Sequence, residues 1–164
     1  MRLIHLPTFW TVIVDILAWF VIHMGVVYLM VRVPLRWFDP EGPLCRSRKW
    51  ERDGHLYQDV FKIRKWKKYL PDGASMLGKN GFPKSSLKSR QRDYLETFVG
   101  ETCRAEWTHW IIMLFAPFFF LWNTPAVGVI MILYAIAENL PLIMAQRYNR
   151  CRFRRVLGRE RSGE

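Results

Sequence analysis

The 164-residue sequence contains few cysteines and few acidic residues, and both shortages limit the classes of protein to which the chain can belong. The chain has an odd number of cysteines, and their spacing is not that of metal ligands: Cys45, Cys103 and Cys151. They argue against a disulfide framework and predict free thiols, and no metal site is expected. Only 14 acidic residues stand against 25 lysines and arginines, so the formal net charge is +11.

Long stretches of the chain also lack charge. Residues 9–31 contain a single charged side chain, Asp15, and a helix of that length measures about 35 Å, enough to cross a membrane. Two further apolar blocks, residues 107–122 and 126–145, flank the turn Asn123-Thr124-Pro125, where proline ends a helix. These blocks predict an all-α integral membrane protein with an N-terminal transmembrane helix and a C-terminal transmembrane helical hairpin.

The basic residues are concentrated in two segments. Residues 32–106 hold 17 lysines and arginines against 10 acidic residues, and residues 146–164 hold seven against two. The positive-inside rule places both segments in the cytoplasm and the N-terminus outside a cell membrane, whether residues 107–122 span the bilayer or only re-enter it. The first block is too long for a typical signal peptide and lacks a small-x-small cleavage site, so it is expected to remain as an anchor. The whole chain, residues 1–164, is predicted to form one multi-pass membrane domain.

The middle of the basic segment combines aromatic and cationic side chains. In residues 56–70, Phe61 and Ile63 suit the lipid boundary, whereas Arg64, Lys65 and Lys67 suit anionic groups. This pattern predicts a basic interfacial loop on the cytoplasmic face of the bilayer. Nucleic acid is not expected as a partner, because the charge follows membrane sidedness and no nucleic-acid-binding module is present.

The entrance to the second apolar block offers a possible catalytic pair. At 100° per residue, Thr102, Glu106 and His109 share one helix face, with Glu101 beside them and Arg104 on the opposite flank. A carboxylate that holds one nitrogen of an imidazole leaves the other nitrogen able to accept a proton from a hydroxyl. The alternative is a helix that enters a membrane with interface aromatics and solvated charges.

A second polar stripe occurs where the third apolar block ends. Asn139, Gln146 and Arg150 lie within about 40° of each other on a helix, and Arg147 lies beside them. Polar groups within membrane helices usually face a bundle interior or a water-filled cavity. An interhelical hydrogen bond followed by stop-transfer arginines is the alternative, although it explains Asn139 and Gln146 less well.

These stretches resemble a known family. The motifs are Arg64-Lys65-Trp66-Lys67 with Asp72-Gly73, then Glu101-Thr102, Arg104-Ala105-Glu106 and His109-Trp110, and finally Asn139, Pro141 and Gln146-Arg147-Tyr148-Asn149-Arg150. In this order they resemble the bacterial glycosyl-4,4'-diaponeurosporenoate acyltransferases of carotenoid pathways. The resemblance implies a membrane enzyme that places a fatty acyl chain on a sugar hydroxyl of a glycosylated C30 carotenoid acid, in a staphyloxanthin-like pathway.

Chemistry and motif position together suggest the roles of the residues. His109, oriented by Glu106, is expected to deprotonate the sugar hydroxyl, and Glu101 belongs to the same catalytic group. Arg104, Arg147 and Arg150 are expected to stabilise the oxyanion or to bind donor phosphates. The donor is expected to be an acyl thioester, either acyl-CoA or acyl carrier protein, and no cofactor is expected. The residues expected to bind substrate are Asn139, Gln146, Arg147, Asn149, Arg150, Arg64, Lys65, Trp66, Lys67 and Asp72.

Two other functions stay open at this point. One is acyl transfer to another glycolipid, and the other is a non-catalytic membrane subunit whose basic surface binds an anionic partner or lipid. The sequence lacks the His-x-x-x-x-Asp motif of the glycerophosphate acyltransferases, since Asp59 follows His55 one residue too early. A direct transfer is favoured because no serine or cysteine adjoins His109, although Cys103 keeps an acyl-enzyme possible.

Overall fold

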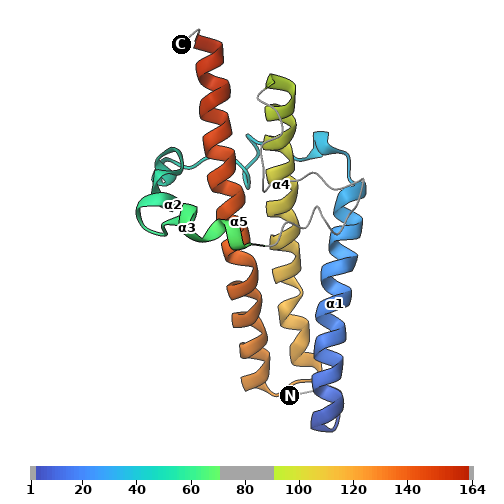
Figure 1. Cartoon of the computed structure of the whole chain (residues 1–164). Helices are drawn as coiled ribbons and strands as arrows, with labels where there is room; N and C mark the ends of the chain where they lie inside the picture. The colour runs from blue at the N-terminus through green and yellow to red at the C-terminus, as the bar shows by residue number, and fades with distance from the viewer. Residues whose placement is uncertain (1–2, 71–90, 163–164) are drawn as a thin grey trace. The chain divides into compact units, whose positions relative to one another are not determined.

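The computed structural model describes residues 3–70 and 91–162, with side chains described as far as residue 158 (Figure 1). These residues form helices and turns without a strand, which confirms the prediction of an all-α protein for the described part of the chain. Three helices are long: α1 (Thr8–Arg32), α4 (Arg92–Leu114) and α5 (Pro125–Ser162). The short elements are η1 (Leu35–Trp37), η2 (Lys49–Gly54), α2 (His55–Asp59), α3 (Ile63–Trp66), η3 (Lys67–Tyr69) and η5 (Ala116–Leu121).

Helices α1 and α5 are long and apolar enough to cross a membrane. The bounds of α1 differ by one residue at each end from the predicted 9–31. Large apolar side chains on both helices point outward, among them Ile16 and Leu29, with 63% and 62% of their surface exposed, and Leu133, with 60% exposed. Such outward-facing apolar surface is unusual in water and suits contact with lipid.

The other two helices differ from the predicted apolar blocks. Helix α4 begins at Arg92, within the basic segment, because Leu95, Phe98 and Val99 bury one of its faces. It ends at Leu114, and the rest of the predicted block 107–122 includes the 3₁₀ helix η5, which has a proline in its first turn. Helix α5 continues through Pro141 and the basic tail as far as Ser162, well beyond the predicted end at residue 145.

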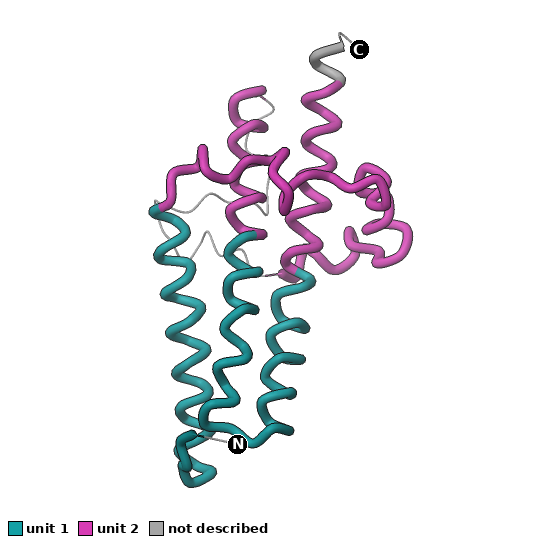
Figure 2. Tube along the Cα trace, turned by 180° about the vertical axis from the view of Figure 1, so that it is seen from behind, with its two compact units in different colours: residues 1–32, 107–141 teal, residues 33–106, 142–164 magenta. Residues whose placement is uncertain are grey.

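The chain folds into two compact units (Figure 2). Unit 1 contains residues 1–32 and 107–141, which include α1, the end of α4, η5 and the first part of α5. Unit 2 contains residues 33–106 and 142–164, which are the basic parts of the chain. The sequence predicted one membrane domain and did not indicate that the basic segments form a compact unit with buried side chains of their own.

The core of unit 1 is aromatic and apolar. The ring of Trp19 stacks on Phe119 with the ring centres 4.6 Å apart, and Ile112 and Ala135 are buried beside them. Asp15, the single charged residue inside α1, is buried as well. Its Oδ1 accepts hydrogen bonds from Trp122 Nε1 and from Asn123 Nδ2, each at 2.7 Å. Residues just before α5 therefore supply the hydrogen bonds that the buried carboxylate of α1 needs.

The core of unit 2 is small. Tyr57, Ile63, Ala145 and Tyr148 are buried together, so α2 and α3 pack against α5. The prediction that Ile63 faces lipid is wrong, because its side chain is fully buried in this cluster. Phe61 is exposed, with 46% of its surface accessible, as an interfacial side chain requires.

Candidate functional site

Unit 2 contains a buried cluster of opposite charges, here called the arginine–carboxylate cluster: Glu51, Tyr57, Glu106, Arg147 and Arg150. Glu51, Glu106 and Arg150 are at most 1% exposed. Arg147 lies between the two carboxylates, 2.8 Å from Glu51 Oε1 through Nε and 2.6 Å from Glu106 Oε1 through Nη1. Arg150 pairs with the other oxygen of Glu106. The two arginines and two glutamates balance in charge, as buried ions require.

The donor groups of Arg147 are saturated. Its Nη2 donates to Glu51 Oε2 at 2.9 Å, which completes a two-pronged contact with that carboxylate. The guanidinium also donates to the backbone carbonyls of Leu44 and Arg46, at 2.9 and 3.1 Å. Every nitrogen of the guanidinium therefore donates within the cluster, which makes Arg147 a link between elements of unit 2.

The pKa values in this cluster reflect the pairing. Burial lowers the pKa of Arg147, but its hydrogen bonds to Glu51 and the charge of Glu106 outweigh burial and raise the pKa above its ordinary value. Burial raises the pKa of Glu51, but hydrogen bonds from Arg147 and Tyr57 outweigh it, so the pKa is lowered overall. Burial and Glu51 raise the pKa of Tyr57, which keeps its hydroxyl protonated. That hydroxyl donates to Glu51 Oε1 at 2.6 Å.

A strained turn places Tyr57 in the cluster. Arg52, Asp53 and Gly54 adopt φ values of 50°, 53° and 88° directly before α2. A Cβ atom on Gly54 would meet the Cβ of Cys151 at 3.0 Å. The position therefore needs glycine both for its backbone and for its space.

The three cysteines surround this cluster and are free thiols, as predicted. Arg150 Nη1 donates to Cys103 Sγ at 3.4 Å. A hydrogen bond with Cys103 and burial raise the pKa of the Cys45 thiol. Cys103 is fully buried, which separates it from any substrate in this conformation.

Two of the predicted catalytic residues, Glu101 and Arg104, contact each other on α4. Arg104 Nη1 lies 2.8 Å from Glu101 Oε1, and both side chains are largely buried. Arg104 Nη2 also donates to the Val33 carbonyl at 3.1 Å, which ties α4 to the segment that follows α1.

His109 belongs to unit 1, where its Nδ1 lies 2.9 Å from Asn139 Oδ1. Asn139 Nδ2 donates to the Ala135 carbonyl at 2.9 Å, which fixes the orientation of the amide. Because Asn139 Oδ1 can only accept, His109 Nδ1 must carry a proton, and in the neutral imidazole Nε2 then holds the lone pair. The prediction had assigned this orienting role to Glu106, whose carboxylate instead binds Arg147 and Arg150.

A second histidine in unit 1 was not predicted. His23 Nδ1 lies 2.8 Å from the Trp19 carbonyl, and His23 Nε2 lies 3.5 Å from Glu138 Oε1. The carbonyl requires a proton on Nδ1, so the nitrogen that faces Glu138 holds a lone pair unless the imidazole is positively charged. A lone histidine within an apolar segment gave no signal, because its partner lies in another helix.

Three cations of unit 2 gather around Tyr148 and are here called the cation cluster: Arg64, Lys67 and Arg152. Arg64 Nε donates to the Tyr148 hydroxyl at 2.7 Å. Lys67 Nζ donates to Asn149 Oδ1 at 2.8 Å and lies 5.1 Å from the centre of the Tyr148 ring. Arg152 Cζ lies 5.7 Å from the same centre. The predicted substrate-binding residues Arg64, Lys67 and Asn149 are thus brought together.

The remaining predicted substrate-binding residues do not belong to either cluster. Trp66 Nε1 donates to the Phe61 carbonyl at 2.7 Å, and Lys65 is exposed. The side-chain oxygen of Gln146 is buried without a hydrogen-bond partner among the described residues. Asp72 lies outside the described residues. Within residues 3–70 and 91–158, no group of three His, Cys, Asp or Glu side chains is arranged to hold a metal ion.

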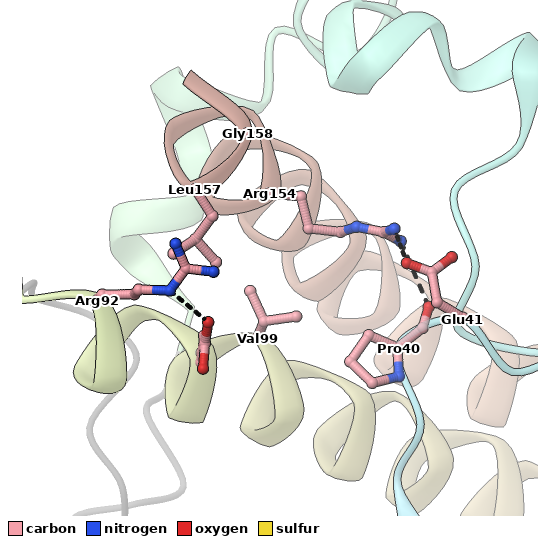
Figure 3. Close-up of a pocket in the computed structure, with 8 residues that line it drawn as sticks. Pro40, Glu41, Arg92, Val99, Arg154, Leu157 and Gly158 are labelled. Carbon is pink, nitrogen blue, oxygen red and sulfur yellow. Dashed lines mark hydrogen bonds and ion pairs between the residues drawn. The ribbon is translucent and has the colours of Figure 1, made fainter. Parts of the chain in front are cut away.

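Unit 2 also contains a cavity of about 370 Å³ (Figure 3). Two ion pairs line it: Arg92 with Glu96, at 2.9 Å, and Arg154 with Glu41. Since each of these arginines has a carboxylate partner, the cavity has little unbalanced positive charge for an acidic ligand. Its remaining lining residues are Pro40, Val99, Leu157 and Gly158.

Comparison with known proteins identifies the class. Residues 34–159 match the family described as glycosyl-4,4'-diaponeurosporenoate acyltransferase. A protein of that name from Staphylococcus aureus strain bovine RF122 / ET3-1 is 33% identical over 140 residues, which cover 85% of this chain and 83% of the relative. The protein of the same name from strain N315 is 32% identical over 139 residues, with the same coverage. No solved structure matches the chain.

The protein is therefore an acyltransferase. It belongs to the glycosyl-4,4'-diaponeurosporenoate acyltransferase family, as the resemblance of its motifs had indicated.

Proposed function

We propose that this protein transfers a fatty acyl chain from an acyl thioester to a sugar hydroxyl of a glycosylated C30 carotenoid acid. The names of its relatives support the glycosylated carotenoid as acceptor. The contact between His109 and Asn139 is the observation that carries the chemical part of the proposal, since it prepares one ring nitrogen to accept a proton.

The reaction is a direct transfer. His109 Nε2 accepts the proton of the sugar hydroxyl as the sugar oxygen attacks the carbonyl carbon of the thioester. The carbon–sulfur bond then breaks, and the thiolate leaves with the proton that the imidazolium returns. An acyl-enzyme on Cys103 is disfavoured, because that thiol is fully buried.

The charged residues of α4 and α5 divide into two roles. Arg147 and Arg150 hold Glu106 and Glu51 in place, so we assign them a structural role in unit 2. Arg104 and Glu101 lie on the same helix as His109, five and eight residues before it. We assign Arg104 to the negative charge that develops on the thioester oxygen, and Glu101 to the orientation of Arg104, which it contacts at 2.8 Å.

The setting of the reaction is the cytoplasmic face of the cell membrane. We propose that α1 and the apolar part of α5 cross the bilayer with the N-terminus outside, which the positive charge of residues 32–106 supports. The apolar surfaces of these helices would hold the acyl and polyene chains. The basic residues from Arg64 to Lys68 would attract acyl-CoA or acyl carrier protein, both of which are acidic.

Lipid analysis of cells with and without the gene tests this function. Mass spectrometry should show a glycosylated carotenoid that lacks one acyl chain when the gene is absent. Restoration by the wild-type gene but not by His109→Ala, at equal protein level, would support the proposed chemistry. An unchanged set of carotenoids together with a change in another glycolipid would reassign the acceptor, and no change in any acylated lipid would refute the function.

A further inference from the structure

The cation cluster differs from Arg147, Arg150 and Arg154 of α5 in how its charge is balanced. Arg147, Arg150 and Arg154 each pair with a carboxylate of unit 2. Among the residues that the structure describes, no carboxylate lies within ion-pair distance of Arg64, Lys67 or Arg152. Three positive charges thus meet at one tyrosine without a carboxylate partner in the described part of the chain.

Three different elements of unit 2 bring these charges together. Arg64 comes from α3, Lys67 from η3 and Arg152 from α5, and all three contact Tyr148, which is only 2% exposed. The buried ring and the Asn149 amide therefore fix where the cationic ends lie. Burial, and after it the charges of Arg152 and Arg64, lower the pKa of Lys67 to about 8, so the neighbouring like charges add to the effect of burial.

We propose that Arg64, Lys67 and Arg152 form a phosphate-binding site beside Tyr148. Two guanidinium groups and an ammonium offer several N–H donors to one anion, and arginine binds phosphate oxygens with two parallel hydrogen bonds. A bound phosphate would supply the negative charge that the cluster lacks. The tyrosine hydroxyl and the asparagine oxygen, which accept from Arg64 and Lys67, would hold the two side chains ready.

The phosphate has two possible sources. It belongs either to the acyl donor, since coenzyme A and acyl carrier protein both carry phosphate, or to the headgroup of an anionic lipid. The role in donor binding rests on the proposed function, whereas phosphate binding itself does not. A binding measurement without turnover therefore separates failure of this proposal from failure of the enzymatic one.

The test measures binding of adenosine 3',5'-bisphosphate to full-length protein in dodecyl maltoside, a detergent without phosphate. Lys67→Gln and Arg152→Gln should each weaken binding about tenfold, because each removes a charge-assisted hydrogen bond. Lys49→Gln is the matched control, since Lys49 is an exposed lysine of unit 2 outside the cluster and the variant loses the same charge. Binding should also weaken as the salt concentration rises.

A second arm measures binding of the same proteins to phosphatidylglycerol vesicles, with phosphatidylcholine vesicles as reference. Loss in the nucleotide arm assigns the site to the donor, and loss in the vesicle arm alone assigns it to a lipid headgroup. Equal losses in Lys49→Gln and the cluster variants, or no loss in either arm, would overturn the proposal. If Lys67→Gln fails to fold, Arg152→Gln keeps the test valid because Arg152 is exposed.

Discussion

At the scale of single residues, His109 is the side chain on which turnover should depend most. A general base contributes about 10²- to 10⁴-fold, so His109→Ala should lower kcat by that factor while the protein still inserts. Asn139→Ala should lower it less, because the imidazole remains but its tautomer is no longer fixed. Acyl transfer by purified variants in nanodiscs measures both effects.

His5→Ala is the matched control, since His5 is an exposed histidine near the N-terminus. Turnover close to wild type in His109→Ala would refute the assigned base and direct the search to His23 and Glu138. The losses in His109→Ala and Asn139→Ala should not add, because Asn139 has nothing to orient once the imidazole is gone.

The arginine–carboxylate cluster should govern stability rather than turnover alone. Glu106→Gln removes one charge from a buried pair and leaves Arg150 without its carboxylate, which typically costs about 3–5 kcal/mol. Glu96→Gln is the control, since its ion pair with Arg92 is exposed and worth at most about 1 kcal/mol. Thermal unfolding in detergent compares the two variants. Equal destabilisation by both would contradict the structural role of the cluster.

The lowered pKa of Glu51 makes part of this stability depend on pH. Its carboxylate stabilises the folded state above its ordinary pKa of 4.5, and the stabilisation is lost as the pH falls through the lowered value. The wild-type melting temperature should therefore drop on acidification below about pH 4.5 more steeply than that of Glu51→Gln. A parallel decline of the two proteins would contradict this assignment.

At the scale of elements, the turn before α2 should tolerate no side chain at Gly54. Gly54→Ala places a Cβ at φ 88° and within 3.0 Å of Cys151, so it should lower stability by about 1–3 kcal/mol. Gly158→Ala is the control, because a Cβ there meets no atom within 4 Å and alanine favours the helix. Melting temperatures of the two variants should move in opposite directions, and a stable Gly54→Ala would show that the turn adapts.

The elements also show what the sequence could and could not predict. The ends of α1 were predicted to within one residue, because a single charge in a long apolar run leaves few alternatives. The start of α4 was missed, although Leu95, Phe98 and Thr102 recur at helical spacing and are all buried. That stripe was the available signal, and the high charge of the surrounding basic segment obscured it.

The candidate site was predicted only in part, because the sequence does not show which residues of different helices meet. A helical wheel compares only near neighbours in sequence, so it paired His109 with Glu106. The partners in the structure come from α5: Asn139 for His109, and Arg147 and Arg150 for Glu106. The polar stripe of α5 was recognised correctly as inward-facing at Asn139 and Arg150, which are each 1% exposed.

At the scale of the whole molecule, membrane sidedness is the main untested prediction. The native cysteines cannot report on it by chemical labelling, because all three are buried. Two introduced cysteines can report on sidedness instead. Leu3→Cys, at a side chain that is 73% exposed, should react with an impermeant maleimide in intact cells. Lys49→Cys should react only after the membrane is permeabilised, and wild-type protein gives the background. The reverse pattern would invert the topology.

The hydrogen bonds of Asp15 have a consequence for how the chain is made. Its partners Trp122 and Asn123 lie 107 and 108 residues later, so the ribosome delivers α1 long before either exists. Throughout that interval a carboxylate sits in an otherwise apolar helix without its native donors. Unit 1 can complete its packing only after nearly three quarters of the chain has been translated. Nascent chains halted before Trp122 should consequently present an unsatisfied acid to the insertion and quality-control machinery.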